Sequence, residues 1–243
     1  MELLPGERID QLRSGAVQII QSAEVFAFSL DAVLLSAFAQ VKANSRVVDL
    51  AAGNGAVGLF VAEQTRNQVT LVELQPRLAD MASRSVTLNQ LTNVNVVTAD
   101  LADTAQFVQK DTVDVVTCNP PYFKVSDQSV KNPNEHLALA RHELTTDFET
   151  VCRVSAQLLK YQGKLFLVHR PDRLQELLST LMQNGLAPKR IRFVHPKADR
   201  EANMVLIEAI KAGKPDGIRI LPPVVVYQAD GTYTQEVAHL LYG

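Results

Sequence analysis

The segment Asn119-Pro120-Pro121-Tyr122-Phe123 combines residue types that suit one particular chemistry. Two successive prolines fix φ and remove two backbone donors, so the nearby carbonyl groups point in a rigid direction. The side-chain oxygen of Asn119 and the carbonyl of Pro120 could accept both hydrogens of a planar amine, whose nitrogen would then pyramidalise toward an electrophilic methyl group. Tyr122 could stack on a base, which contributes on the order of 1 to 3 kcal/mol. We predict methyl transfer to a planar amine, with Pro121, Tyr122 and Phe123 as substrate contacts.

A second segment, from Asp49 to Gly58, reads as a nucleotide-binding loop between a strand and a helix. Glycines there let a backbone approach a ligand and turn sharply into a helix, whose first N–H groups favour polar or anionic groups. The spacing of Gly53, Gly55 and Gly58 also satisfies GxGxxG, and Glu73 follows Gly55 by 18 residues. The glycines alone therefore fit either a nicotinamide dinucleotide or another nucleotide cofactor.

Three features favour S-adenosylmethionine over a dinucleotide. Asp49, just before the loop, can hold the ammonium of an amino-acid head but would repel a pyrophosphate. About 45 residues precede the strand, whereas a dinucleotide fingerprint commonly begins near the start of its domain. The third feature is the segment from Asn119 to Tyr122, which follows another predicted strand and which a dinucleotide fold leaves unexplained.

Further cofactor contacts are predicted from strand ends, where ligands bind in parallel sheets. Glu73 could accept hydrogen bonds from both ribose hydroxyls, while Asp100 could meet the adenine amine and Leu101 could pack on its ring. Phe28 and Asp31 belong to a predicted helix that could cover the ligand. The five histidines and two cysteines give no metal-ligand spacing, so no metal site is expected.

The elements that would position these residues alternate between strands and helices. Short β-branched runs predict strands at 46–50, 68–73, 95–98, 113–118 and 164–169, and two further strands are predicted at 190–194 and 203–210 as an antiparallel pair. Helices are predicted at 56–66, 76–90, 147–161 and 171–184, and residues 9–22 read as a hairpin followed by a helix at 28–38.

This order predicts an α/β, Rossmann-like domain. We expect a seven-stranded, mostly parallel sheet with helices on both faces, an antiparallel strand near one edge and an N-terminal hairpin and helix extension. All 243 residues should form a single domain. Within it, residues 1–44 would cover the cofactor site, 45–212 would form the catalytic core and 213–243 a C-terminal tail.

Composition bounds the possible partners. The chain is 47% hydrophobic and 21% charged, with no apolar run near the roughly 18 residues of a membrane span and no signal peptide, so we expect a cytoplasmic protein, with a monomer favoured. The net charge is -2, but residues 187–219 carry eight Lys/Arg against four acids, or +4. Lys189, Arg190 and Arg192 in this basic segment could contact nucleic-acid phosphates, or could simply be a solvated surface.

Taken together, the motifs resemble those of class I amino methyltransferases. The whole chain more narrowly resembles the bacterial tRNA1(Val) adenine N6-methyltransferase family, through Phe28-x-x-Asp31-x-x-Leu34-Leu35, Asn119 to Phe123, Ala140-Arg141-His142-Glu143 and the tail from Pro222 to Val237. The resemblance implies methylation of an adenine beside the anticodon, with roles in cofactor and amine binding for Asp49, Gly53, Gly55, Glu73, Asp100 and Asn119 to Tyr122. By the same resemblance, Arg141 and His142 could grip phosphate or pair with Glu143.

Other functions stay open at this point. A protein glutamine presents the same planar nitrogen, and ribosomal RNA or DNA could replace tRNA as the nucleic acid. A redox or non-catalytic nucleotide-binding domain would use only the glycine loop. The basic segment favours RNA over glutamine.

Overall fold

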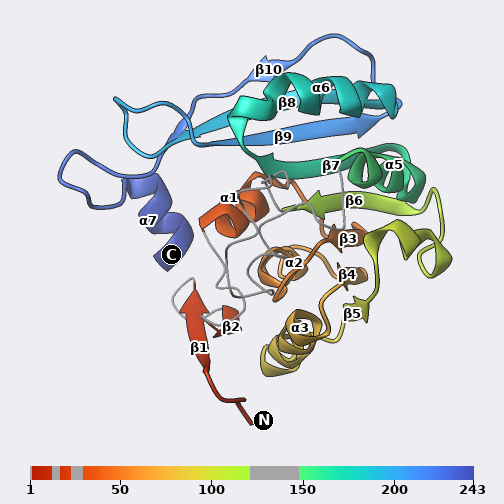
Figure 1. Ribbon diagram of the computed structural model, residues 1–243, viewed down its shortest axis with the longest axis vertical. Helices are drawn as coiled ribbons and strands as arrows, with labels where there is room; N and C mark the ends of the chain where they lie inside the picture. Colours follow the sequence, from red (N-terminus) through yellow and green to blue (C-terminus); the bar gives the residue numbers. More distant parts are fainter. Residues whose placement is uncertain (1, 13–16, 23–29, 121–147) are drawn as a thin grey trace, which may run out of the picture.

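A computed structural model describes residues 2–12, 17–22, 30–120 and 148–243. Its centre is a nine-stranded sheet with helices on both faces (Figure 1). The strand order across the sheet is β10 (Arg219–Ile220), β8 (Leu186–His195), β9 (Met204–Lys211), β7 (Leu159–His169), β6 (Val113–Cys118), β3 (Val47–Leu50), β4 (Val69–Glu73) and β5 (Val94–Thr98), with β11 (Val224–Val225) also paired to β8.

The five central strands are parallel, as predicted. β3 and β4 are buried along their whole length because helices cover both faces, which explains their unbroken apolar sequences. β7 begins at Leu159, five residues earlier than predicted, directly where α5 (Phe148–Leu158) ends. Its early start is permitted by an irregularity in the register with β6, where Val113 pairs with Leu159 and Val115 with Lys164.

The predicted antiparallel pair is present: β9 runs antiparallel to both β7 and β8, which leaves β8 parallel to the central strands. Two strands were not predicted, so the expected count of seven is corrected to nine. β10 and β11 each have two residues and pair in parallel with β8, at Arg190 and Val194 among other positions. Strands this short have no side-chain periodicity from which to predict them.

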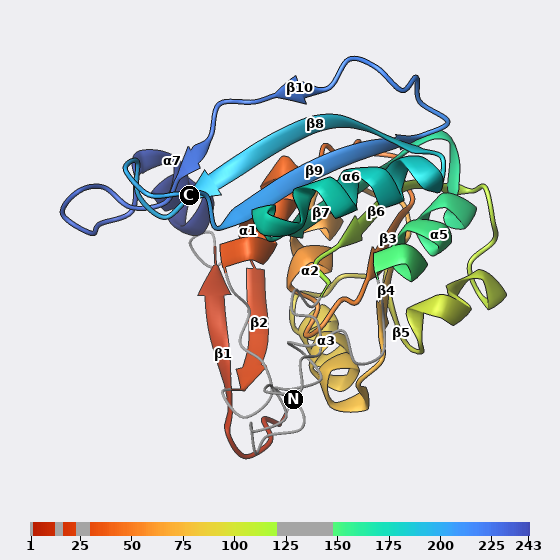
Figure 2. The same cartoon turned by 45° about the horizontal axis from the view of Figure 1, so that its top comes forward.

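The helices divide into two layers (Figures 1 and 2). One face carries α1 (Leu30–Phe38), α2 (Ala56–Ala62), α3 (Pro76–Leu88) and α7 (Gln235–Tyr242), and the other carries α5, α6 (Leu174–Gln183) and two 3-10 turns, η1 (Leu101–Gln106) and η3 (Pro171–Arg173). Each layer encloses its own hydrophobic cluster against the sheet. The segment predicted as a tail therefore contributes two strands and α7, which contacts α1.

The predicted N-terminal hairpin is formed by β1 (Glu7–Leu12) and β2 (Val17–Ser22), and its tip lies outside the described residues. β2 packs on α3, where Ile20 joins Leu78 and Met81 in a small buried cluster. Arg84 of α3 also binds Glu7 through two hydrogen bonds of 2.7 Å. The hairpin is thus fixed to the helix that follows the second central strand.

Candidate active site

The parallel strands bring the predicted cofactor residues to one edge of the sheet. Cys118 of β6 pairs with Leu50 of β3, so the chain leaves both strands side by side, toward Asn119 on one and Ala51 on the other. Glu73 ends the next strand, and Asp100 follows the one beyond it. The carboxyl edge is where open α/β sheets bind ligands.

The predicted nucleotide-binding loop connects β3 to α2 through residues 51–55, which we call the cofactor loop, and both of its glycines are left-handed, Gly53 at φ 59° and Gly55 at φ 88°. A side chain at Gly53 would enter open space with no described atom within 4 Å, which leaves room for a ligand against the backbone. Gly58 has a different role, because a side chain there would overlap Leu71 of β4. The loop therefore lets α2 lie close to the sheet while its start stays open.

Ala51 also has a left-handed backbone, with φ 53°, although it carries a side chain. Such a conformation costs an L-residue roughly 1 to 2 kcal/mol. Strain of this kind persists only where the surroundings impose it, and here it lies at the first residue of the cofactor loop. Sequence reasoning missed it, since nothing about an alanine signals positive φ.

Asp49 is 1% exposed, and its Oδ1 accepts a 2.6 Å hydrogen bond from the Thr117 hydroxyl on β6. Its Oδ2 has no hydrogen-bond partner among the described residues. Burial raises the pKa of the Asp49 carboxyl to about 7 and the nearby Glu73 charge adds to this effect, while hydrogen bonds to the carboxyl from the Thr117 hydroxyl and the Gly58 backbone oppose it. A buried carboxylate oxygen without a donor fits the ammonium of S-adenosylmethionine, which would supply the missing partner and favour the charged form.

Glu73 is 6% exposed, and backbone amides hold both of its oxygens. Gly53 N–H donates to Oε2 and Gln75 N–H donates to Oε1, each at 2.8 Å. Burial raises the pKa of Glu73, while these hydrogen bonds oppose that rise. A carboxylate can accept about four hydrogen bonds, so the fixed carboxylate keeps capacity for the predicted ribose hydroxyls.

Asp100 caps η1, with its Oδ1 accepting a 2.9 Å hydrogen bond from Ala102 N–H. Leu101 is 5% exposed and packs in the cluster beneath α5. Asp100 and Leu101 therefore lie at the start of η1, at the carboxyl edge of the sheet. Their adenine contacts stay predictions. Asp31 lies in the first turn of α1 and is half-buried.

Of the segment Asn119 to Phe123, which is predicted to bind the substrate amine, the structure describes only the first two residues. Asn119 is half-buried and Pro120 is buried, both directly after β6. The other predicted contacts lie outside the described residues: Phe28, Pro121, Tyr122, Phe123, Arg141 and His142. Their assigned roles remain those given by the sequence.

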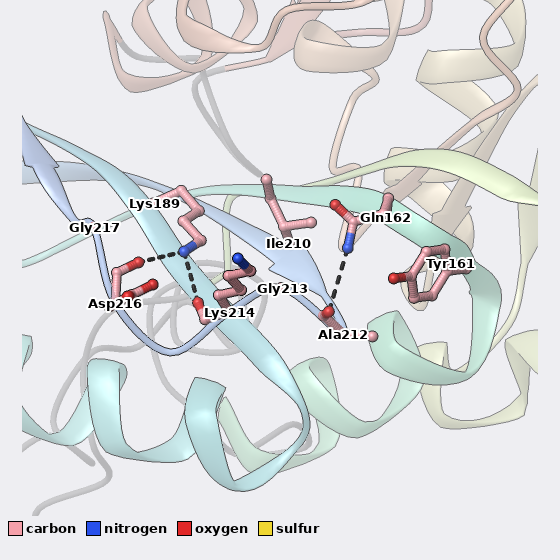
Figure 3. A pocket seen from close by; sticks show the side chains of 9 residues that line it. All are labelled: Tyr161, Gln162, Lys189, Ile210, Ala212, Gly213, Lys214, Asp216 and Gly217. Atoms are coloured by element: carbon pink, nitrogen blue, oxygen red, sulfur yellow. Dashed lines mark hydrogen bonds between the residues drawn. The ribbon is translucent and has the colours of Figure 1, made fainter.

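Lys189 lies toward the opposite edge of the sheet, beside a cavity lined by Tyr161, Gln162 and the turn after β9 (Figure 3). Its ammonium donates a 2.6 Å hydrogen bond to Lys214 O and a second bond to Asp216 O. These contacts hold the segment after β9 against β8. They give Lys189 a structural role that the sequence did not predict.

Arg190 and Arg192 also have partners within the chain. Arg190 binds the buried Glu208 at 2.7 Å, and Arg192 binds Glu236 of α7 at 2.7 Å and Pro222 O at 2.9 Å. Both arginines thus tie β8 to its neighbours. The basic segment is therefore a weaker argument for RNA binding than its charge suggested, and direct RNA contact by these side chains stays a prediction.

Comparison with known proteins identifies the family. A family model described as the methyltransferase small domain matches residues 17–186, which is more than half of the chain. The chain belongs to the methyltransferase small domain family. Membership confirms the predicted cofactor, S-adenosylmethionine, and identifies the protein as a methyltransferase.

Relatives of this methyltransferase agree with the resemblance read from the motifs. A protein of Shewanella sp. (strain MR-4) named tRNA1(Val) (adenine(37)-N6)-methyltransferase is 27% identical over 214 residues, covering 87% of this chain and 89% of the relative. A Phocaeicola vulgatus protein of the same name is 27% identical over 177 residues, or 73% and 74% of the two chains. The predicted similarity to this group is confirmed.

Solved structures confirm the predicted fold. A protein from Agrobacterium tumefaciens described as a predicted O-methyltransferase superposes with a TM-score of 0.69 at 25% identity, covering 86% of this chain and 94% of its own. TYW2 of P. horikoshii, solved in complex with MeSAdo, gives 0.61 at 13% identity, covering 86% and 72%, and supports the fold alone.

No described helix is long and apolar enough to cross a membrane. Within the same part of the chain, no group of three or more His, Cys, Asp or Glu residues could hold a metal ion.

Proposed function

We propose that this methyltransferase transfers a methyl group from S-adenosylmethionine to the exocyclic N6 amine of an adenine in tRNA, next to the anticodon of tRNA1(Val). The observation that supports this most strongly is the pairing of Leu50 with Cys118. Because of it, Asn119 and Pro120 leave the sheet beside the cofactor loop. The two residues predicted to accept the amine hydrogens would thereby lie beside the site that would hold the methyl donor.

In this proposal three carboxylates each bind a different part of the cofactor. Asp49 Oδ2 accepts from the ammonium, the Glu73 carboxylate accepts from the ribose hydroxyls, and Asp100 accepts from the adenine amine. When bound, S-adenosylmethionine supplies a methyl group already activated by its sulfonium. The open backbone at Gly53 allows close approach of the ligand to the loop.

Asn119 and Pro120 would act on the substrate amine. Its lone pair is delocalised into the purine ring, and two acceptors that bind both hydrogens favour the pyramidal nitrogen of the transition state. No strong general base is needed before transfer, since the amine loses a proton after it has become cationic. Tyr122 would stack on the base, and Arg141 and His142 would contact phosphate.

The choice of tRNA rests on the names of the relatives and on the basic segment. A protein glutamine remains a second candidate because Lys189, Arg190 and Arg192 are already engaged within the chain. If they do contact RNA, neutralising all three should weaken tRNA binding and flatten its salt dependence, with unfolding measured alongside. We also propose that the enzyme acts in the cytoplasm as a monomer.

Isotope transfer tests the proposal. The protein is incubated with methyl-labelled S-adenosylmethionine and, separately, with tRNA, ribosomal RNA, DNA or a protein extract. Label in tRNA supports the proposed function, label only in protein supports glutamine methylation, and label in neither overturns both. Thermal melting gives an independent check on the cofactor, because S-adenosylhomocysteine should raise the melting temperature and NADH should not.

A further inference from the structure

Side chains from α3 and the cofactor loop, and Asn89 just after α3, form hydrogen bonds with the backbone groups of β2 that do not face β1. Gln18 and Ile20 direct their backbone N–H and C=O groups away from β1, as alternate residues of an antiparallel strand do. Asn89 accepts from Gln18 N–H at 2.8 Å and donates to Gln18 O at 2.6 Å. Ser85 Oγ accepts from Ile20 N–H at 3.0 Å, and Asn54 Nδ2 donates to Ile20 O at 3.1 Å.

Asn54 is the one of these three side chains that belongs to the cofactor loop. It lies between Gly53 and Gly55, both left-handed, and it is 1% exposed. The loop is therefore held at two points. Gly53 N–H binds Glu73 from the sheet, and the Asn54 side chain binds Ile20 from the hairpin.

Ser85 extends this connection to α3. Its hydroxyl is fully buried and donates to Met81 O at 2.7 Å while it accepts from Ile20. The backbone N–H of Ile20 therefore donates to Ser85, and the backbone C=O of Ile20 accepts from Asn54. A shift of β2 away from α3 would displace the acceptor on which Asn54 depends.

We propose that Asn54 is a positioning residue for S-adenosylmethionine and that the N-terminal hairpin, anchored on α3 by Ser85 and Asn89, fixes the conformation of the cofactor loop through it. A loop with two glycines has many alternative backbone conformations, and the bond to Ile20 selects the one that faces the ligand. The inference rests on the proposed cofactor contacts and is independent of the methyl acceptor.

The test measures S-adenosylhomocysteine binding by calorimetry in Asn54→Asp, Ser85→Ala and their double variant. Asn54→Asp keeps the shape of the side chain but replaces the amide donor with a carboxylate oxygen that repels Ile20 O, so the dissociation constant should rise about tenfold. Ser85→Ala should raise it about fivefold, although Ser85 reaches the loop only through β2. Because both substitutions act through Ile20, the dissociation constant of the double variant should rise by about as much as in the more affected single variant, and not by the product of the two fold-changes.

Thr87→Ala is the matched control, because Thr87 makes the same kind of hydroxyl-to-backbone bond on α3, to Ser83 O, but is not among the β2 contacts. It should leave the dissociation constant unchanged. A purely structural role for Ser85 would lower its melting temperature without changing ligand affinity, and that result overturns the inference. A dissociation constant that rises in the double variant by the product of the two single fold-changes also overturns the inference. If Asn54→Asp does not fold, the dissociation constant of Ser85→Ala still tests the inference. Failure of the wild type to bind S-adenosylhomocysteine would instead contradict the proposed cofactor contacts.

Discussion

Replacing Asp49 with asparagine should make the ligand-free protein more stable at neutral pH and less able to bind its cofactor. The pKa of this buried carboxyl is about 7, against an ordinary value of 3.8. The native state therefore binds a proton more tightly than the unfolded chain, and the free energy of unfolding falls as pH rises from about 4 to about 7. The full effect is about 4 kcal/mol, from 1.36 kcal/mol per pKa unit.

Asparagine removes this cost but adds a smaller one. Its Oδ1 can still accept from Thr117, while its amide group would lack an acceptor, at about 1 to 3 kcal/mol. Between pH 5 and pH 8 the wild type should lose about 3 kcal/mol relative to Asp49→Asn. The variant should thus be the more stable protein at pH 8 by about 2 kcal/mol.

Urea denaturation of both proteins at pH 5, 6, 7 and 8 measures this difference, since titrating groups shared by the two largely cancel. Calorimetry at the same pH values should show S-adenosylhomocysteine binding the wild type more tightly as Asp49 ionises, and binding the variant weakly throughout. A stability difference that does not change with pH would refute the reasoning about the buried carboxyl.

Three further predictions follow from the site and the sheet. Asn119→Ala should abolish methyl transfer while S-adenosylhomocysteine binding stays within about twofold, and retained turnover would exclude the proposed amine contact. Gly53→Ala and Gly185→Ala share a left-handed backbone and open surroundings, so each should lose about 1 kcal/mol in urea denaturation, but only Gly53→Ala should weaken cofactor binding, by at least about tenfold. Arg190→Met should lower the free energy of unfolding by about 2 kcal/mol because it leaves the buried Glu208 with one fewer cation, and an unchanged urea midpoint would contradict this role.

Much of the fold could be predicted because its signals are local. β3, β4 and β6 are short β-branched runs, and β6 was placed at Val113–Cys118 with both ends correct. Parallel strands then determine which ends meet, so Asp49, Glu73 and Asn119 could be assigned to one edge. The strands β10 and β11 escaped prediction because their pairing with β8 is set by tertiary contacts.

The site was less predictable where function depends on a partner far away in the sequence. The charge of Lys189 and Arg192 suggested a surface for phosphate, yet their partners lie in the segment after Lys211 and in α7. Asn54 had no signal beyond its place between two glycines, because its partner is a backbone carbonyl 34 residues away. Only the fold brings such pairs together.

The central claim is tested most directly by the nucleosides of the methylated product. Wild type and Asn119→Ala are incubated with tRNA and S-adenosylmethionine carrying a heavy methyl group, and the digested tRNA is examined by mass spectrometry. Heavy N6-methyladenosine is expected with the wild type and none with Asn119→Ala. Heavy methyl on another nucleoside, or equal N6-methyladenosine with both proteins, would contradict the central claim.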